Sequence, residues 1–452
     1  MIERLVIFGA SGDLTSRLLL PAIAQLAEAA QLPAGFTIVG SDLKEWSTGD
    51  FRDHIAGRLE EHATVTPATR DAVVAMLDFR PGNVTSPDDV SGVIGGDRPD
   101  TLVYLALPPK LLTPALPALA ASGLGAADAV AIEKPFGTDL ASAHELNQIL
   151  RLRLPEPTVF RIDHFLSNEL VRRIVVLRFL NRVFEPILNA AHVERVDISW
   201  LESLTLEGRA SYYDTAGAMK DMLQNHLMEV MALVLMEQPA RIDADSFRDV
   251  RVEALRAVAT PAAGRMRSQT VRARYAAGTI GSRQVPSYVD EPGVDPDRNT
   301  ETYAALTLDL NNPRWAGVPF TLRSGKAIES DSAEIAIHFR PLPRYLTEAW
   351  PGVEPNVLRV GLTEPYVRLA TTLNGPARTA ESRELEARST PPQFTAYAHL
   401  IQQMLNSDPM LSIRGDEAEE AWRIIDPVMA AWSAGDVPMQ EYPAGTAPPG
   451  PA

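Results

Sequence analysis

Residues 5–14 read Leu5-Val-Ile-Phe-Gly9-Ala-Ser-Gly12-Asp-Leu14, and this stretch decides how the N-terminal part of the 452-residue chain folds. Its first four residues form a short apolar run, which is typical of a buried strand, and the first of two glycines follows directly. Apolar residues then recur at helical spacing over residues 18–26. A strand, a glycine turn and a helix in this order predict the first half of a βαβ unit. Such a turn lets a pyrophosphate approach the backbone where the helix begins.

Three more apolar runs, each closed by a turn, extend the pattern, at residues 36–39, 102–107 and 129–132. The closing turns begin at Gly40, Pro108 and Glu133. Strands that alternate with helical patterns predict a Rossmann-like, doubly wound parallel sheet, and we assign residues 1–165 to this dinucleotide-binding domain. The binding site of such a sheet lies at the carboxyl ends of its strands, where these turns are expected.

The pattern changes after about residue 165. Strand-like runs then follow one another with only a few helices between them, as at residues 304–310, 333–339 and 366–372. This arrangement predicts an α+β domain over residues 166–440, built on a large, mainly antiparallel sheet. The last segment, residues 441–452, is rich in proline, glycine and alanine, and we expect a flexible tail there.

Composition narrows the classes of protein. The 58 acidic residues outnumber the 42 basic ones, and the net charge of -16 argues against a nucleic-acid-binding surface. The sequence has no cysteine, which excludes disulfides, thiolate catalysis and a cysteine-based zinc site. The start lacks a signal-peptide layout, and no apolar stretch reaches the length of a membrane span. We therefore expect a cytoplasmic protein that binds neither nucleic acid nor membrane and holds no metal.

Two polar stretches, residues 161–169 and 212–237, carry most of the candidate chemistry. His226 lies on a predicted helix behind Asp221, while Asp163 and His164 belong to the other stretch. A lone helical histidine is more often structural than catalytic, but a second polar cluster that meets it across a cleft changes that balance. An imidazole paired with a carboxylate beside a nicotinamide ring is what the oxidation of a sugar hydroxyl requires. The residues therefore favour an oxidoreductase.

Asp42 follows the second predicted strand and bears on the choice of cofactor. A carboxylate at this position accepts hydrogen bonds from the adenosine ribose hydroxyls and repels a ribose 2′-phosphate. The alternative is an exposed turn aspartate, and the nearby Lys44 would soften the repulsion. Of the two cofactors NAD and NADP, the sequence favours NAD.

These segments resemble the glucose-6-phosphate dehydrogenase family over nearly the whole chain. The motifs that carry the resemblance are residues 9–14, 104–109, 133–137, 161–164, 212–214, 221–226, 314–320, 322–326, 416–422 and 442–445. The resemblance implies oxidation of C1 of glucose 6-phosphate, or of a closely related hexose, to a lactone with hydride transfer to NAD(P). It also implies a homodimer or homotetramer formed through the sheet of the second domain.

The resemblance further implies roles for individual residues. His226 takes the proton of the C1 hydroxyl, and Asp163 orients His226. His164 matches a phosphate ligand, and the positions expected to bind the substrate are His164, Lys134, Glu202, Asp221, Lys326 and Asn168. The positions expected to bind the cofactor are Gly9, Ser11, Gly12, Asp13, Leu14, Asp42, Pro108 and Lys134.

The chain departs from the family's pattern in the phosphate-binding motif. The usual signature Asp-His-Tyr-Leu-Gly-Lys-Glu here reads Asp163-His-Phe-Leu-Ser-Asn-Glu169, so a tyrosine hydroxyl and a lysine ammonium are missing. A charged hydrogen bond to phosphate contributes about 1.5–3 kcal/mol. Arg172, one helical turn beyond Asn168, is either a replacement cation or a solvated helix residue. Two alternatives therefore stay open: the same oxidation of a non-phosphorylated or C6-modified hexose, and a non-catalytic paralogue that only binds nucleotide.

Overall fold

The computed structural model describes residues 1–152, 154–167, 169–350, 352–375 and 379–450. The chain divides into two compact units. The first unit comprises Met1–Glu169, Pro239–Asp249 and Pro392–Glu419, and the second comprises Leu170–Gln238, Val250–Pro391 and Glu420–Ala452. The boundary predicted near residue 165 lies close to the first crossing, while two later segments return to the first unit.

The first unit contains a sheet of parallel strands, as predicted. Within the described residues it has six strands, in the order β3-β2-β1-β4-β5-β6. Their bounds are β1 Arg4–Phe8, β2 Thr37–Ser41, β3 Leu77–Phe79, β4 Thr101–Leu105, β5 Ala129–Glu133 and β6 Val159–Ile162. Every residue of β1 and β4 is buried. Helices cover both faces of such a sheet, which is why these strands read as unbroken apolar runs.

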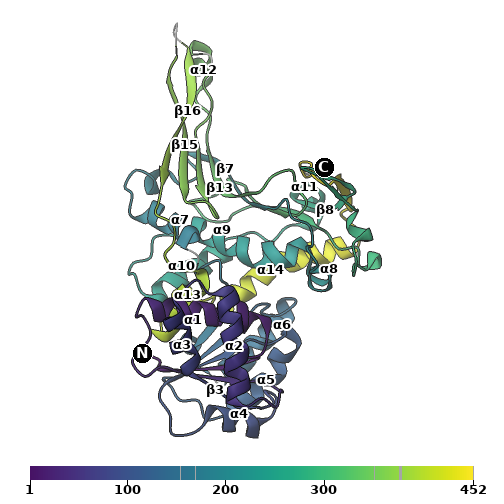
Figure 1. Cartoon of the computed structure of the whole chain (residues 1–452). Helices are drawn as coiled ribbons and strands as arrows, with labels where there is room; N and C mark the ends of the chain where they lie inside the picture. The colour runs from purple at the N-terminus through teal and green to yellow at the C-terminus, as the bar shows by residue number, and fades with distance from the viewer. Residues whose placement is uncertain (153, 168, 351, 376–378, 451–452) are drawn as a thin grey trace. The chain divides into compact units, whose positions relative to one another are not determined.

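The helices between these strands surround the sheet in the purple to blue part of the ribbon (Figure 1). Their bounds are α1 Leu20–Glu28, α2 Thr48–His62, α3 Pro67–Ala75, α4 Pro87–Ile94, α5 Pro109–Ala121 and α6 Leu140–Arg151, and a short π-helix, η1, covers Thr15–Leu19. Capping boxes at Ser47 and Asp139 begin α2 and α6. In a capping box the N-cap side chain accepts from the backbone N–H of the N3 residue, and the N3 side chain accepts from the backbone N–H of the N-cap residue. Ser47 and Asp139 therefore fix where α2 and α6 begin.

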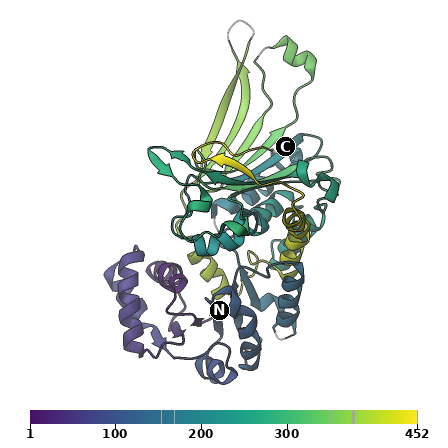
Figure 2. The ribbon, with the colours of Figure 1, turned by 90° about the vertical axis from the view of Figure 1, so that its right-hand side faces the viewer.

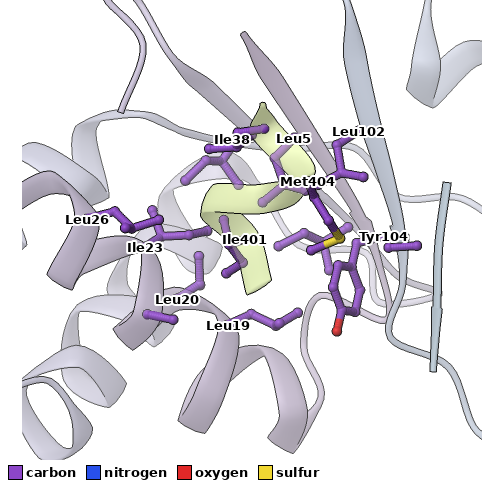
Figure 3. Close-up of a cluster of buried hydrophobic side chains, with 14 of the residues drawn as sticks. Leu5, Leu19, Leu20, Ile23, Leu26, Ile38, Leu102, Tyr104, Ile401 and Met404 are labelled. Atoms are coloured by element: carbon purple, nitrogen blue, oxygen red, sulfur yellow. The ribbon is translucent and has the colours of Figure 1, made fainter. Parts of the chain in front are cut away.

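A helix from far along the chain completes the core of the first unit. Helix α13, Ala396–Leu405, places Met404 beside Leu5 and Leu102 of the central strands, and Ile401 in the same buried cluster (Figure 3). Thr395, at the N-cap of α13, donates from its backbone N–H and from its hydroxyl to Gln25 Oε1, at 3.1 Å in both cases. Burying a side chain of this size contributes roughly 1.5–3 kcal/mol, so the sheet depends on a segment that follows it by more than two hundred residues.

The second unit is built on a larger sheet that is mostly antiparallel, again as predicted. Among the described residues it has nine strands, in the order β16-β15-β14-β13-β7-β12-β11-β8-β17. Only the β7–β12 and β8–β17 pairs are parallel. The bounds are β7 Val193–Leu201, β8 Thr270–Ala276, β11 Tyr303–Leu308, β12 Phe320–Gly325, β13 Ser332–Phe339, β14 Val357–Gly361, β15 Tyr366–Asn374, β16 Ala380–Arg388 and β17 Gln440–Pro443. Figure 2 shows β15 and β16 as a long hairpin in light green.

Strand β17 includes residues that the sequence analysis assigned to a flexible tail. Tyr442 is buried in this strand, and its hydroxyl donates to the backbone oxygen of Lys326 at 2.6 Å. A small hairpin of β9, Gly278–Ile280, and β10, Arg283–Val285, stands apart from the large sheet.

The helices of the second unit include α8 Ala210–Ala218, the π-helix η4 Met219–Leu227, α9 Met228–Leu235, α11 Met266–Gln269 and α12 Arg344–Ala349. The chain passes between the units within α7 Glu169–Phe179, α10 Ala244–Arg256 and α14 Gly415–Ser433. Single-turn helices occur at Glu156–Thr158, Glu185–Ile187, Ala263–Arg265, Tyr288–Asp290 and Pro296–Arg298. Every residue of α9 is buried, as expected for a helix that is apolar all round. No helix in the described part of the chain is both long and apolar enough to cross a bilayer.

The role of α13 in the first unit can be tested with Met404→Ala. Met404 is fully buried, and truncation to alanine leaves a cavity in the core. We expect a loss of about 2–5 kcal/mol in the free energy of unfolding, measured by urea denaturation. Gln403→Ala, a partly exposed position on the same helix, is the matched control and should change the stability far less. Equal losses for the two variants would contradict the packing described here.

Candidate functional site

The glycine loop after β1 has the geometry that a phosphate-binding turn requires. Gly9 has a φ of +85°, and a side chain at this position would collide with the backbone oxygen of Ala106 beyond β4. The N–H of Gly12 donates to Gly9 O at 3.1 Å, and the N–H of Ser16 donates to Gly12 O at the same distance. The loop therefore turns tightly into η1, with no side chain at Gly9 between its backbone and an approaching ligand. The predicted residues Asp13 and Leu14 lie in the same turn.

Asp42 lies directly after β2, beside this loop. Its Oδ2 accepts a 2.8 Å hydrogen bond from the hydroxyl of Ser11 and a 3.3 Å bond from the Ser11 N–H. Its Oδ1 accepts from the N–H of Leu43 at 2.7 Å. The ammonium of Lys44 lies 4.1 Å from the ring centroid of Trp46. Three donors thus fix the Asp42 carboxylate, and Lys44 is directed to an aromatic ring.

The end of β5 carries a half-buried carboxyl, that of Glu133, beside the predicted Lys134. Tyr104, on β4, donates its hydroxyl to Glu133 Oε1, and Tyr397, on α13, donates to the same atom at 3.3 Å. Desolvation raises the pKa of Glu133 from 4.5 to about 7, although the two tyrosine hydroxyls act in the opposite direction. The peptide bond between Lys134 and Pro135 is cis. Pro108, another predicted cofactor residue, is the N-cap of α5.

Asp163 and His164 follow β6 directly. Asp163 is buried, and its Oδ1 accepts from the N–H of Phe165 at 2.9 Å. The His164 ring stacks on Tyr397, with centroids 5.9 Å apart and an interplanar angle of 15°. It also meets the Phe165 ring edge to face at 5.1 Å. The turns after β1, β2, β4, β5 and β6 share one edge of the parallel sheet, which is where a ligand is expected. Asn168, also predicted to bind substrate, lies outside the described residues.

The second unit presents His226 and Asp221 on the π-helix η4. The His226 side chain is buried, and its backbone N–H donates to Asn225 Oδ1 at 2.6 Å. Asn225 donates in turn to Lys220 O at 3.1 Å. Asp221 accepts from the hydroxyl of Tyr212 at 3.1 Å. π-Helical turns are frequent at functional sites, and both π-helices among the described residues, η1 and η4, coincide with predicted functional stretches.

Glu202 and Lys326 form an ion pair at the ends of neighbouring strands. β7 and β12 are parallel, with Leu201 opposite Gly325, so the residues that follow them lie side by side. The Lys326 ammonium donates to Glu202 Oε2 at 2.7 Å and lies 5.4 Å from the ring centroid of Tyr213. Lys326 is buried, so the cation is partly removed from water and retains a fixed position. The structure thus brings together two residues that the sequence analysis predicted separately.

Comparison with known proteins assigns the chain to a family. The model of the NAD binding domain of glucose-6-phosphate dehydrogenase matches residues 6–173, and the model of its C-terminal domain matches residues 175–452. The chain belongs to the glucose-6-phosphate dehydrogenase family. The two matches confirm the resemblance on which the sequence analysis relied.

Individual members of the family match over nearly their full lengths. Glucose-6-phosphate 1-dehydrogenase 2 of Mycobacterium tuberculosis is 37% identical over 98% of this chain and 90% of its own length. The enzyme of Bacillus subtilis is 34% identical over 98% and 94%. A solved glucose-6-phosphate dehydrogenase in complex with glucose 6-phosphate superimposes with a TM-score of 0.88 at 29% identity, covering 99% of this chain and 95% of that one. The Mycobacterium avium enzyme gives 0.87 at 31% identity, covering 98% and 94%.

In each of the two units, several of the predicted site residues lie close to one another. The first unit brings the glycine loop, Asp42, Lys134, Asp163 and His164 to one edge of a sheet. The second unit holds Asp221 and His226 on one helix and Glu202 beside Lys326. The predicted pairing of Asp163 with His226 joins residues of different units and stays a prediction.

Two side chains near Lys134 were not selected from the sequence. Tyr104 lies inside a family motif at the end of β4, so its position next to a strand end was a usable signal. Tyr397 has no such signal, because it reaches Glu133 across a sequence separation of 264 residues. Its helix shows an apolar face in the sequence, but that face does not indicate its partner.

The raised pKa of Glu133 predicts a pH-dependent stability. A carboxyl that ionises near pH 7 when folded and near 4.5 when unfolded binds its proton more tightly in the folded state. Stability therefore falls as the pH rises through this window, and the loss is complete above about pH 7. Glu133→Gln keeps an acceptor for both tyrosines but cannot ionise. The difference in unfolding free energy between the variant and the wild type should therefore shift by about 2–3 kcal/mol in favour of the variant as the pH rises from about 5 to about 8.

Urea denaturation across that pH range measures the difference. Glu145→Gln is the matched control, since Glu145 is an exposed carboxylate in the same unit. Its stability should follow the wild type at every pH. A Glu133→Gln variant that also follows the wild type would show that the Glu133 carboxyl titrates normally.

Proposed function

We propose that this chain oxidises C1 of glucose 6-phosphate to the lactone and passes the hydride to a nicotinamide cofactor bound by the first unit. The observation that carries the proposal is the retention of Asp163, His164 and His226 in a chain that both family models cover almost completely. Relatives that match over 98% of the chain are named glucose-6-phosphate 1-dehydrogenase, and one related structure contains glucose 6-phosphate.

In the proposed reaction His226 is the general base. The proton of the C1 hydroxyl passes to the imidazole of His226. The electron pair of the broken O–H bond forms the lactone carbonyl, and the hydrogen on C1 leaves as hydride with both electrons of the C1–H bond. When bound, the nicotinamide ring accepts that hydride. The Asp163 carboxylate orients the imidazole and stabilises its protonated form, in the way a carboxylate supports a catalytic histidine elsewhere. The Asn225 side chain, which accepts from the His226 N–H, fixes the backbone that presents the ring.

The remaining polar residues are assigned to the sugar phosphate. Lys326 and His164 are the groups proposed to face the phosphate, and Asp221, Glu202 and Lys134 are proposed to bind the hydroxyls. The Glu202 contact holds the Lys326 ammonium in place, which limits the entropy lost when an anion binds. Positive charge from Lys326 and His164 would offset the loss of the tyrosine hydroxyl and the lysine of the family motif.

Asp42 is proposed to favour NAD over NADP. Its carboxylate is fixed by Ser11 and Leu43, so it cannot turn away from a ligand without breaking hydrogen bonds. It can accept from ribose hydroxyls, whereas a ribose 2′-phosphate would place two like charges close together. Lys44, which is engaged with Trp46, is poorly placed to neutralise that repulsion.

The proposed function predicts that purified protein reduces a nicotinamide cofactor rapidly with glucose 6-phosphate and much more slowly with glucose. His226→Asn should lower kcat by at least about 10²-fold, because the base is lost while the shape is nearly kept. His144→Asn, at an exposed position on α6, is the matched control and should retain full activity. Initial rates from the absorbance of the reduced cofactor give both comparisons.

Two results would count against this function. Higher kcat/KM for a neutral or C6-modified hexose would mean that the chemistry serves another sugar. Cofactor binding without turnover of any sugar would identify a nucleotide-binding paralogue without catalysis.

The cofactor proposal predicts that the wild type has a higher kcat/KM for NAD than for NADP. Asp42→Ala should raise the ratio of NADP to NAD efficiency by about ten-fold or more, since one like-charge contact is removed. Asp53→Ala removes the same charge from an exposed position on α2 and should leave the ratio unchanged. A wild type that prefers NADP, or equal shifts in the two variants, would exclude Asp42 as the discriminating residue.

A further inference from the structure

Three consecutive residues just before β11 hold three different segments of the second unit. The Thr300 hydroxyl donates to Asp214 O at 2.7 Å, in α8. Glu301 Oε1 accepts from the N–H of Met219 at 3.0 Å, at the first residue of η4. Thr302 O accepts from the N–H of Lys326 at 3.0 Å. One short stretch of backbone therefore connects the helix that carries His226 with the strand end that carries Lys326.

The carboxyl of Glu301 is buried beside the first residue of η4, although Glu301 itself lies in another segment. The first N–H groups of a helix have no partner within it, and Glu301 supplies one through its side chain. The backbone oxygen of Glu301 also accepts from the N–H of Ala218 at 3.3 Å, so two successive N–H groups are held by one residue. Burial raises the pKa of Glu301, against the effect of the Met219 hydrogen bond and of the charges on Arg272 and Lys220. A carboxyl at this helix end can accept the bond in either protonation state.

The backbone of Gly217 fits closely against this carboxyl. Gly217 has φ +67° and ψ 173°, which interrupts α8 immediately before η4 begins. A side chain at Gly217 would collide with the carboxyl oxygens of Glu301. The positive φ and the absence of space each require glycine here. The position of the Glu301 carboxyl and the point at which η4 begins are thus mutually constrained.

The start of η4 also determines where the predicted site residues lie. Met219 is followed in the same helix by Asp221 and, two turns on, by His226, so a displaced start moves both side chains. Thr302 shares a 3.1 Å hydroxyl contact with Tyr442, which itself donates to Lys326 O. The two ends of the predicted substrate site are therefore anchored at neighbouring residues of one segment.

We propose that Glu301 is a positioning residue for the reaction, whose hydrogen bond to the Met219 N–H sets the start of the helix that presents Asp221 and His226. The inference rests on the proposed function, because it assigns His226 to catalysis. Glu301 acts through the helix, and the acceptor oxygen is the feature that matters.

The test compares three substitutions at this position. Glu301→Gln keeps the shape and an acceptor oxygen, Glu301→Leu keeps the approximate volume without an acceptor, and Glu301→Asp draws the carboxyl back by one methylene. Well below the thermal midpoint of each variant, kcat should fall about ten-fold or more in Glu301→Leu and remain within about three-fold of the wild type in Glu301→Gln. The KM for the cofactor, which binds to the first unit, should change by less than about two-fold.

Amide hydrogen exchange over residues 219–227 gives a readout that does not depend on turnover. Exchange should accelerate in Glu301→Leu and match the wild type in Glu301→Gln. If the leucine variant does not fold, Glu301→Asp takes its place, with the same expected losses. Unchanged kcat and exchange in the variants that lack a reachable acceptor would overturn the proposal. A glutamine variant as impaired as the leucine variant would also overturn it.

The two proposals fail in different ways. If the wild type turns over no sugar phosphate, the proposed function fails, and the exchange experiment still reports whether Glu301 fixes the helix. If the wild type is active and the leucine variant differs only by a lower thermal midpoint, Glu301 has a structural role alone and the positioning role is excluded.

Discussion

The hydrogen-bond pattern of a parallel sheet that is covered on both faces determines where chemistry can occur in the first unit. Its central strands are buried throughout, so an unpaired polar side chain within them would lose water without gaining a partner. The predicted site residues of this unit lie instead beyond the strands: Gly9, Asp42, Lys134 and Asp163 each occur within two residues of a strand end. Because all strands are parallel, these ends share one edge. The site follows from the packing of the sheet.

In the second unit, helix η4 is mixed in composition, and three of its polar residues, Gln224, Asn225 and His226, are buried. Buried polar groups are hydrogen-bonded in stable proteins, and here the partners come from the helix itself, from α8 and from the segment before β11. Asn225 accepts from its neighbour His226, Tyr212 donates to Asp221, and Glu301 accepts from the start of the helix. Each bond removes a cost of desolvation and also fixes an orientation. The same interactions that allow the polar residues to be buried therefore hold them in place for chemistry.

The sequence was sufficient for features that depend on local patterns. The apolar run before Gly9 and the glycine turn predicted β1 and its loop, and alternating runs predicted both sheets. It was insufficient where the contact is remote. The apolar face of α13 predicts burial, but only the folded chain shows Met404 against Leu5 and Tyr397 against Glu133. Likewise the pairing of Glu202 with Lys326 depends on the parallel register of β7 and β12, which periodicity cannot define.

The altered phosphate motif is compatible with the packing of the first unit. Phe165 stands where the family usually has tyrosine, and its ring is buried against the edge of His164. A tyrosine hydroxyl at a buried position needs a partner, such as a substrate phosphate, whereas phenylalanine needs none. The substitution therefore leaves no unsatisfied hydroxyl in this packing, and the aromatic contact still orients His164. Stacking on Tyr397 supports the same ring from another side. The two aromatic contacts therefore hold the His164 ring without any hydroxyl at residue 165.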